Sequence, residues 1–61
     1  MGYVLYITRV FEDGIIYEYE YSNMDHALKQ YAQEKTADIL EYKNGKEYLF
    51  RRKIDGKERE V

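Results

Sequence analysis

The sequence predicts an α+β fold of two layers, in which an antiparallel sheet of four to five strands carries one helix on one face. The dipeptides Asp13-Gly14, Asn44-Gly45 and Asp55-Gly56 each separate two strand-like runs, which is the strongest short-range signal of a β-hairpin. A single segment between the first two hairpins has apolar residues at helical spacing. The order of elements is therefore ββαββ, with an optional fifth strand, in one domain over 1–61.

The first hairpin pairs a strand over about 3–11 with a strand over about 15–21, and two registers are open to it. A two-residue loop sets Arg9 opposite Glu18 but mixes glutamates into the apolar face of the first strand. A three-residue loop, with Gly14 as the left-handed residue of a bulge, gathers the apolar side chains on one face. They are Leu5, Ile7, Phe11, Ile15, Tyr17, Tyr19 and Tyr21. Because a one-residue slip exchanges the faces, the cleaner apolar face favours the three-residue loop.

The helix is expected over about 23–35. Ser22 is a good N-cap, and Asp25 three residues later completes a weaker form of the capping box. The apolar residues then recur at the spacing of a one-sided helical stripe. They are Met24, Ala27, Leu28, Tyr31 and Ala32. This stripe predicts which side of the helix packs on the sheet.

The second hairpin is expected to pair strands over about 38–43 and 46–54. Alternation in the latter places Tyr48, Phe50 and Ile54 toward the helix, and Glu47, Leu49, Arg51 and Lys53 away from it. The turn at Asp55-Gly56 then leads either into a short strand over 57–61 or into a frayed tail. A two-residue turn there would set Lys53 against Glu58 and Arg51 against Glu60.

The first strand is apolar on both faces, which indicates a central position in the sheet. Placing the third strand beside it gives the order 2-1-3-4, fully antiparallel. The fifth strand, where it forms, pairs beside the fourth. Tyr17, Tyr19 and Tyr21 would then form the floor of the core beneath the helix.

The residue types argue against catalysis, so the chain is not expected to be an enzyme. It has no cysteine and one histidine, His26, which excludes disulfides, thiolate metal sites and a multi-histidine site within one chain. The one serine is explained by the helix cap, and His26 is expected on the helix surface. The four glycines are dispersed and form no phosphate-binding loop, so no cofactor is expected.

The N-terminal segment lacks the pattern of a signal peptide, and no apolar run approaches the length of a membrane span. The absence of cysteine fits a reducing compartment. We therefore expect a cytoplasmic protein without membrane contact, in a bacterial host cell if a phage encodes it.

Charge is unevenly placed along the chain, whose net charge is −2. Residues 1–42 carry a net −5, and residues 43–61 carry a net +3. The segment "YLFRRK" mixes aromatic and cationic side chains, which suits stacking on bases and contact with phosphates. A nucleic-acid-binding module is therefore the alternative function, carried by Arg51, Arg52, Lys53 and Lys57.

The leading hypothesis is a protein-binding module that acts through the face of the sheet away from the helix. In the three-residue register this face has an apolar centre with charged residues around it, as protein interfaces have. The candidate interface residues are Val4, Tyr6, Val10, Ile16, Glu18, Glu20 and Leu49. The partner is either another protein or a second copy of the chain, and a homodimer would compensate for the small core of so short a chain.

The stretches "FEDG", "IIYEYEYSNMDHALKQYA" and "ILEYKNGKEY" resemble short ββαββ proteins from phages and mobile elements of Gram-positive bacteria. The resemblance covers about residues 3–50 and rests on turn and cap chemistry. It implies a protein that binds and modulates another protein, as an inhibitor or adaptor, and it assigns no site residue. The regular turns and the absence of proline also fit a designed protein, although eight tyrosines are less regular than designs usually are.

Overall fold

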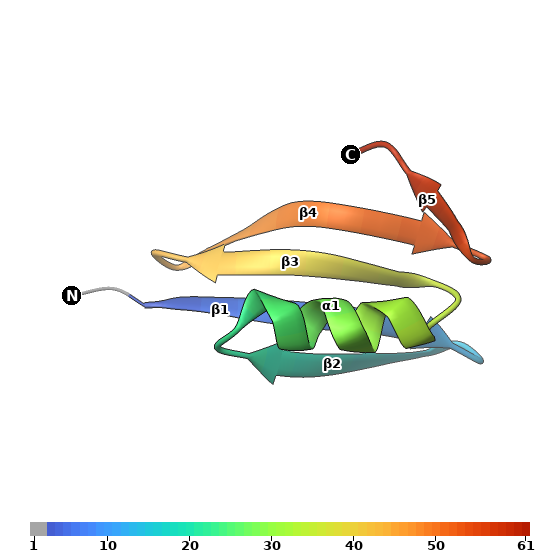
Figure 1. The fold of residues 1–61 in the computed structure, drawn as a ribbon, viewed down its shortest axis with the longest axis horizontal. Helices are drawn as coiled ribbons and strands as arrows, with labels where there is room; N and C mark the ends of the chain where they lie inside the picture. Colours follow the sequence, from blue (N-terminus) through green and yellow to red (C-terminus); the bar gives the residue numbers. More distant parts are fainter. Residues whose placement is uncertain (1–2) are drawn as a thin grey trace.

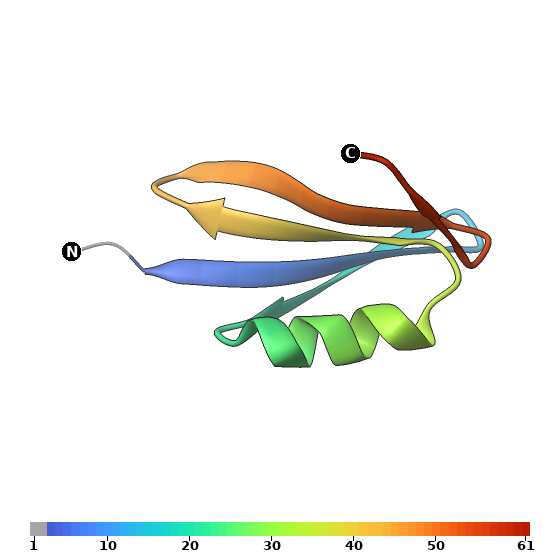
Figure 2. The same cartoon turned by 45° about the horizontal axis from the view of Figure 1, so that its top comes forward.

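The computed structural model describes residues 3–61, and it has one sheet of five antiparallel strands with one helix on one face (Figures 1 and 2). The elements are β1 (Val4–Glu12), β2 (Ile15–Tyr21), α1 (Met24–Gln33), β3 (Ala37–Lys43), β4 (Lys46–Ile54) and β5 (Lys57–Arg59). The strand order is β2-β1-β3-β4-β5, which confirms the predicted fold class and the central place of β1. The optional fifth strand forms, and it pairs Lys53 with Glu58 as predicted.

All three hairpins turn through two residues that both have positive φ. Asp13 has φ 52° and Gly14 has φ 76°, and nearly the same values recur at Asn44-Gly45 and Asp55-Gly56. Positive φ at both central residues is the type I′ turn, whose twist matches that of the flanking strands. Aspartate and asparagine enter this region more readily than other residues with a side chain, which explains the repeated dipeptides.

The two-residue turn shows that the predicted bulge at Gly14 is wrong. β1 pairs with β2 so that Arg9 opposes Glu18 and Glu12 opposes Ile15. The predicted faces of β1 are therefore exchanged, and Leu5, Ile7 and Phe11 lie on the side of the sheet away from α1. Because β1 is apolar on both faces, either register buries apolar side chains, and the turn chemistry decides between them.

The helix begins one residue later than predicted and ends at Gln33. Asn23, not Ser22, is the N-cap, and its Oδ1 accepts a hydrogen bond of 2.7 Å from the N–H of Asp25. Asparagine caps helices as well as serine does, so the two candidates could not be separated by residue type. Glu34 has extended backbone and leads the chain out of the helix.

The core lies between α1 and the central strands β1 and β3. Its buried members are Val10, Ala27, Tyr31, Ala37 and Ile39, with Tyr6, Tyr21, Met24 and Leu28 packed around them. The fully buried Thr8 lies at the same level, where its Oγ1 donates a hydrogen bond of 2.8 Å to the carbonyl oxygen of Ala27. Alanines on both layers let the helix approach the sheet closely enough for this bond.

The loop 34–36 joins the helix to β3 and accepts hydrogen bonds from two other parts of the fold. The N–H of Phe11 donates to the carbonyl oxygen of Thr36 at 3.0 Å, and the N–H of Gly56 donates to that of Lys35 at 2.7 Å. The N–H of Asp55 donates to the hydroxyl oxygen of Thr36 at 3.1 Å. One short loop thereby holds the end of β1 and the turn between β4 and β5.

An irregularity in the pairing of β3 and β4 corrects the predicted faces of β4. Between Ile39 and Leu40 the register shifts, so that Leu40 opposes Leu49 whereas Ile39 opposes Arg51 and Phe50 is the extra residue. Such a bulge breaks the alternation of faces. Tyr48 and Leu49 face as predicted, but beyond Phe50 the prediction is wrong.

Beyond the bulge, Arg51 and Lys53 turn toward the helix, where their charged groups lie 5.1 and 4.5 Å from the centre of the Tyr31 ring. Ile54 lies on the opposite side. The predicted pairing of Arg51 with Glu60 does not form, because β5 ends at Arg59. Arg51 forms an ion pair with Glu58 at 2.8 Å instead.

Replacing Ile39 by alanine should lower the free energy of unfolding by about 2–5 kcal/mol, the range found for buried isoleucines. Ile39 is fully buried at the centre of the core. The matched control is Ile16→Ala on the outer strand, which is 59% exposed and should change stability by less than about 1 kcal/mol. Urea unfolding in dilute solution measures both changes, and equal losses would contradict this assignment of the faces.

Candidate protein-binding face

The side of the sheet opposite α1, called here the helix-free face, carries a row of alternating charge across four strands. Glu18 on β2 opposes Arg9 on β1, Arg9 opposes Asp38 on β3, and Asp38 opposes Arg52 on β4. Residues that oppose one another across antiparallel strands share a face, so the four side chains form one line. We call these four residues the charged row.

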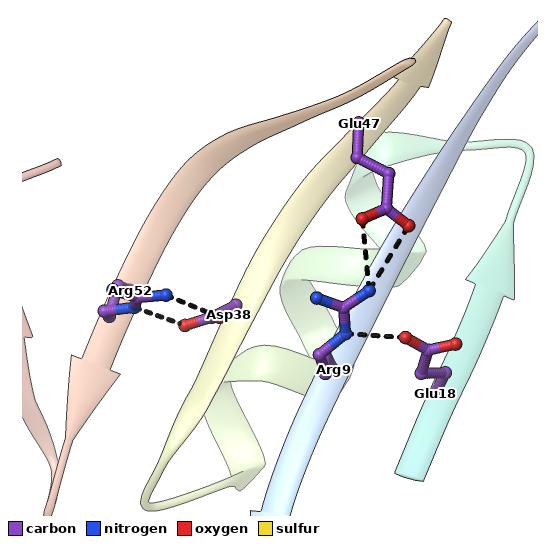
Figure 3. Close-up of polar contacts among 5 residues, drawn as sticks. All are labelled: Arg9, Glu18, Asp38, Glu47 and Arg52. Atoms are coloured by element: carbon purple, nitrogen blue, oxygen red, sulfur yellow. Dashed lines mark hydrogen bonds and ion pairs between the residues drawn. The ribbon is translucent and has the colours of Figure 1, made fainter. Parts of the chain in front are cut away.

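Ion pairs join the members of the charged row in two separate pairs, in front of the sheet with the helix behind it (Figure 3). Arg9 Nε lies 2.6 Å from Glu18 Oε2, and Arg9 Nη2 lies 3.3 Å from Glu47 Oε2 on β4. Arg52 holds Asp38 through two hydrogen bonds, Nε to Oδ1 at 2.8 Å and Nη2 to Oδ2 at 3.1 Å. Paired donors of this kind fix the orientation of both side chains.

Glu47 extends the charged row along the sheet. Its hydrogen bond with Arg9 joins β4 to β1 and crosses over β3. Leu40 on β3 lies beneath this crossing and is 6% exposed. Burial alone would lower the pKa of Arg9, but its bonds to Glu18 and Glu47 raise it above the usual value. The hydrogen bonds with Asp38, and then its charge, raise the pKa of Arg52. Both arginines therefore keep their charge.

Apolar side chains lie on both sides of the charged row. At the end near the first turn are Phe11, Ile16 and Ile54, of which Ile16 is the most exposed. On the other side Ile7, Leu40 and Leu49 oppose one another in a line over three strands. Leu5 and Tyr42 oppose each other beyond that line. The helix-free face thus has apolar side chains on both sides of an ordered charged row, with Glu20 and Glu47 as further charges on one side.

The structure divides the predicted interface residues between the two faces. Ile16, Glu18, Glu20 and Leu49 lie on the helix-free face. The prediction is wrong for Val4, Tyr6 and Val10, which lie on the helix side.

The reason for this division is the two-residue register, which turns the even-numbered positions of β1 toward α1, so that Val10 and Tyr6 pack in the core. Sequence reasoning missed Arg9, Asp38 and Phe11 on the helix-free face. The available signal was the opposition of Arg9 and Glu18 in the register that was rejected.

The predicted basic residues do not form one surface. Arg51 and Lys53 lie over the Tyr31 ring on the helix side, whereas Arg52 lies on the helix-free face with Asp38. Lys57 begins the edge strand β5. The nucleic-acid alternative therefore stays a prediction that this arrangement does not favour.

The tyrosines of β2 lie on the helix side, as predicted, but they are not all part of the core. Tyr17 is 42% and Tyr19 is 40% exposed, because β2 is an edge strand that the helix covers only in part. Tyr21 packs against the core, and its hydroxyl donates to Gln30 Oε1 at 3.3 Å. His26 lies on the helix surface, as predicted, with its ring edge-on to Tyr21 at 6.2 Å.

A depression of about 500 Å³ lies beside the first turn and the end of the helix, and its lining includes the carboxylates of Glu12, Asp13, Glu34 and Asp55. Within residues 3–61 there is no group of three or more His, Cys, Asp or Glu side chains arranged to hold a metal ion. Over the same residues, no helix has the length and apolarity needed to cross a membrane.

Comparison with protein-family models, with curated proteins and with solved structures gives no match for this chain. The resemblance to short ββαββ phage proteins thus stays a prediction, and the function has to be argued from the geometry alone.

Replacing Arg9 by glutamine should lower the free energy of unfolding by about 1 kcal/mol, because two partly exposed ion pairs are lost and Glu18 and Glu47 are left facing one another. Arg59→Gln is the control, since Arg59 on the terminal strand forms no ion pair with any of residues 3–61. Thermal unfolding at low and high salt measures both. An Arg9 variant as stable as the parent at low salt would show that the charged row contributes nothing to folding.

Replacing Tyr31 by phenylalanine should flatten the loss of stability in alkaline solution. Burial, followed by the hydrogen bond that its hydroxyl donates to Glu58 at 2.8 Å, raises the pKa of Tyr31 above its usual 10. The unfolded chain then loses this proton first, so the stabilisation is complete below pH 10 and falls as the pH rises above it.

The measurement is the midpoint of urea unfolding between pH 9 and pH 11. Tyr17→Phe is the control, because the Tyr17 hydroxyl forms no hydrogen bond within the part of the chain that the structure describes. Parallel alkaline curves for the parent and the Tyr31 variant would contradict the prediction.

Proposed function

We propose that this chain is a small non-enzymatic protein-binding module whose binding surface is the helix-free face of the sheet. The observation that carries the proposal is the placement of apolar side chains on both sides of the charged row. One face of an antiparallel sheet is commonly polar where it meets water. Here that face holds Phe11, Ile16, Tyr42, Leu49 and Ile54, each between 37% and 59% exposed.

The charged row supports the same proposal because its side chains are already ordered. Its ion pairs hold Arg9 and Arg52 in fixed positions before any partner arrives. Ordering long side chains is one of the free-energy costs of association, and preorganisation reduces it. Charged groups at fixed positions also give a partner its orientation and exclude partners with the wrong charge.

An inhibitor or adaptor is the kind of module that suits this surface. The face extends over four strands and carries both exposed apolar side chains and ordered charges. A module with such a face works by covering a surface of another protein molecule. Its affinity would come from the apolar side chains and its specificity from the charged row.

Photo-crosslinking in cells that produce the protein tests this function. A photoreactive amino acid in place of Leu49 on the helix-free face should form crosslinks to protein. The same amino acid in place of Lys29, on the exposed side of the helix, should form none. The mass of the product identifies the partner as another protein or as a second copy. Equal or absent crosslinking at both positions would overturn the proposal.

A further inference from the structure

We propose that the partner of the helix-free face is a second copy of this chain, packed face to face about a two-fold axis that runs parallel to the strands between β1 and β3. This inference rests on the proposed function, since it names the partner of the same surface. What carries it is the order of signs in the charged row, together with the position of that row in the sheet.

The charged row reads negative, positive, negative, positive across β2, β1, β3 and β4. A two-fold axis parallel to the strands places β2 of one copy over β4 of the other, and β1 over β3. Glu18 then faces Arg52 of the second copy, and Arg9 faces Asp38. Every charge in the row meets the opposite sign, so the surface is complementary to itself, as an isologous interface requires.

Other face-to-face orientations lack this property. With the two-fold axis along the charged row, each strand lies over its own copy, and Glu18 meets Glu18 while Arg52 meets Arg52. Like charges brought together at an interface cost several kcal/mol. The charged row therefore selects one orientation of the second copy and rejects the reversed one.

Part of the apolar surface matches as well. In this orientation Ile16 on β2 lies over Ile54 on β4 of the second copy, at the end that also holds Phe11. On the other side of the charged row the buried Ile7 lies over the buried Leu40, and Leu49 lies over Glu20. Packed sheets keep their strand directions within about 30° of one another, so the alignment holds best near the axis. Glu18 and Arg52 carry the contact between copies, because their side chains are 46% and 45% exposed, whereas the Asp38 side chain is 5% exposed and is already held by Arg52.

The area is sufficient for a weak dimer. The four strands have seven or nine residues each. At a strand spacing of about 4.8 Å and a rise of about 3.3 Å per residue, they give a face of about 500 Å² per copy and about 1,000 Å² in total. This total lies at the lower end of specific interfaces, so self-association in the micromolar range or weaker is expected.

Charge exchange between two variants tests the pairing. In a dimer of Glu18→Lys chains, the introduced lysine faces Arg52 of the second copy. In a dimer of Arg52→Glu chains, the introduced glutamate faces Glu18. Each variant alone should therefore associate about tenfold more weakly or worse. In an equimolar mixture both contacts join opposite signs again, and the mixed dimer should recover most of the parent affinity. Sedimentation equilibrium measures all three samples together with the parent chain.

Two charge-neutralising substitutions keep the test valid if the charge-reversed variants do not fold. Glu18→Gln and Arg52→Gln are combined in a double-mutant cycle on the dimer affinity, with circular dichroism of each variant in dilute solution. Within one chain Glu18 and Arg52 lie on β2 and β4, with β1 and β3 between them. Non-additivity between the two substitutions therefore reports a contact between copies.

A parent chain that stays monomeric at the highest soluble concentration would overturn this inference. So would a mixture that fails to recover, or an additive cycle. If crosslinking from position 49 then captures a different protein, the proposed function stands and the partner is not a second copy. If position 49 crosslinks to nothing, the proposed function itself fails.

Discussion

Every face of this protein depends on the two-residue turn at Asp13 and Gly14. Positive φ at both positions fixes the register of β1 and β2, and that register turns the even-numbered residues of β1 toward the helix. Because β1 lies between β2 and β3 and pairs with both, its register also decides which residues of β3 face the helix. A turn with one more residue would exchange the core side and the helix-free side of β1.

The chosen register puts Thr8 at the centre of the helix side, where apolar residues would be expected to lie. Its hydroxyl donates a hydrogen bond to the carbonyl oxygen of Ala27, so the buried hydroxyl keeps a hydrogen-bond partner. The small side chains of Ala27 and Ala37 allow the close approach, but they also contribute little apolar area. The bulkier Ile7 and Leu40 are left on the helix-free face, where only neighbouring side chains cover them. A core of this size is marginal by itself.

Turn chemistry and one clear helical stripe were enough to predict the order of elements, the strand order and even the pair of Lys53 with Glu58. It was harder to predict which residues of each strand face the helix, for two physical reasons. The first strand is apolar on both sides, so hydrophobicity cannot choose its register. The bulge at Phe50 then reverses the alternation of β4, and no residue in "EYLFRRK" marks the extra position. Three of the seven candidate interface residues, all on β1, were placed on the wrong side because of the register of β1, and the four on β2 and β4 were placed correctly.

The charged row and the apolar side chains around it have different physical effects on association. Ion pairs at an interface lose hydration as they form, so their net contribution to affinity is small unless the geometry is well fixed. Apolar area has no such penalty, but it does not distinguish one orientation from another. On the helix-free face the two kinds of surface lie side by side, so in the proposed dimer apolar contact favours association and the order of charges selects the orientation. A mixed face of this kind suits a small chain, because a wholly apolar one would bind without selectivity.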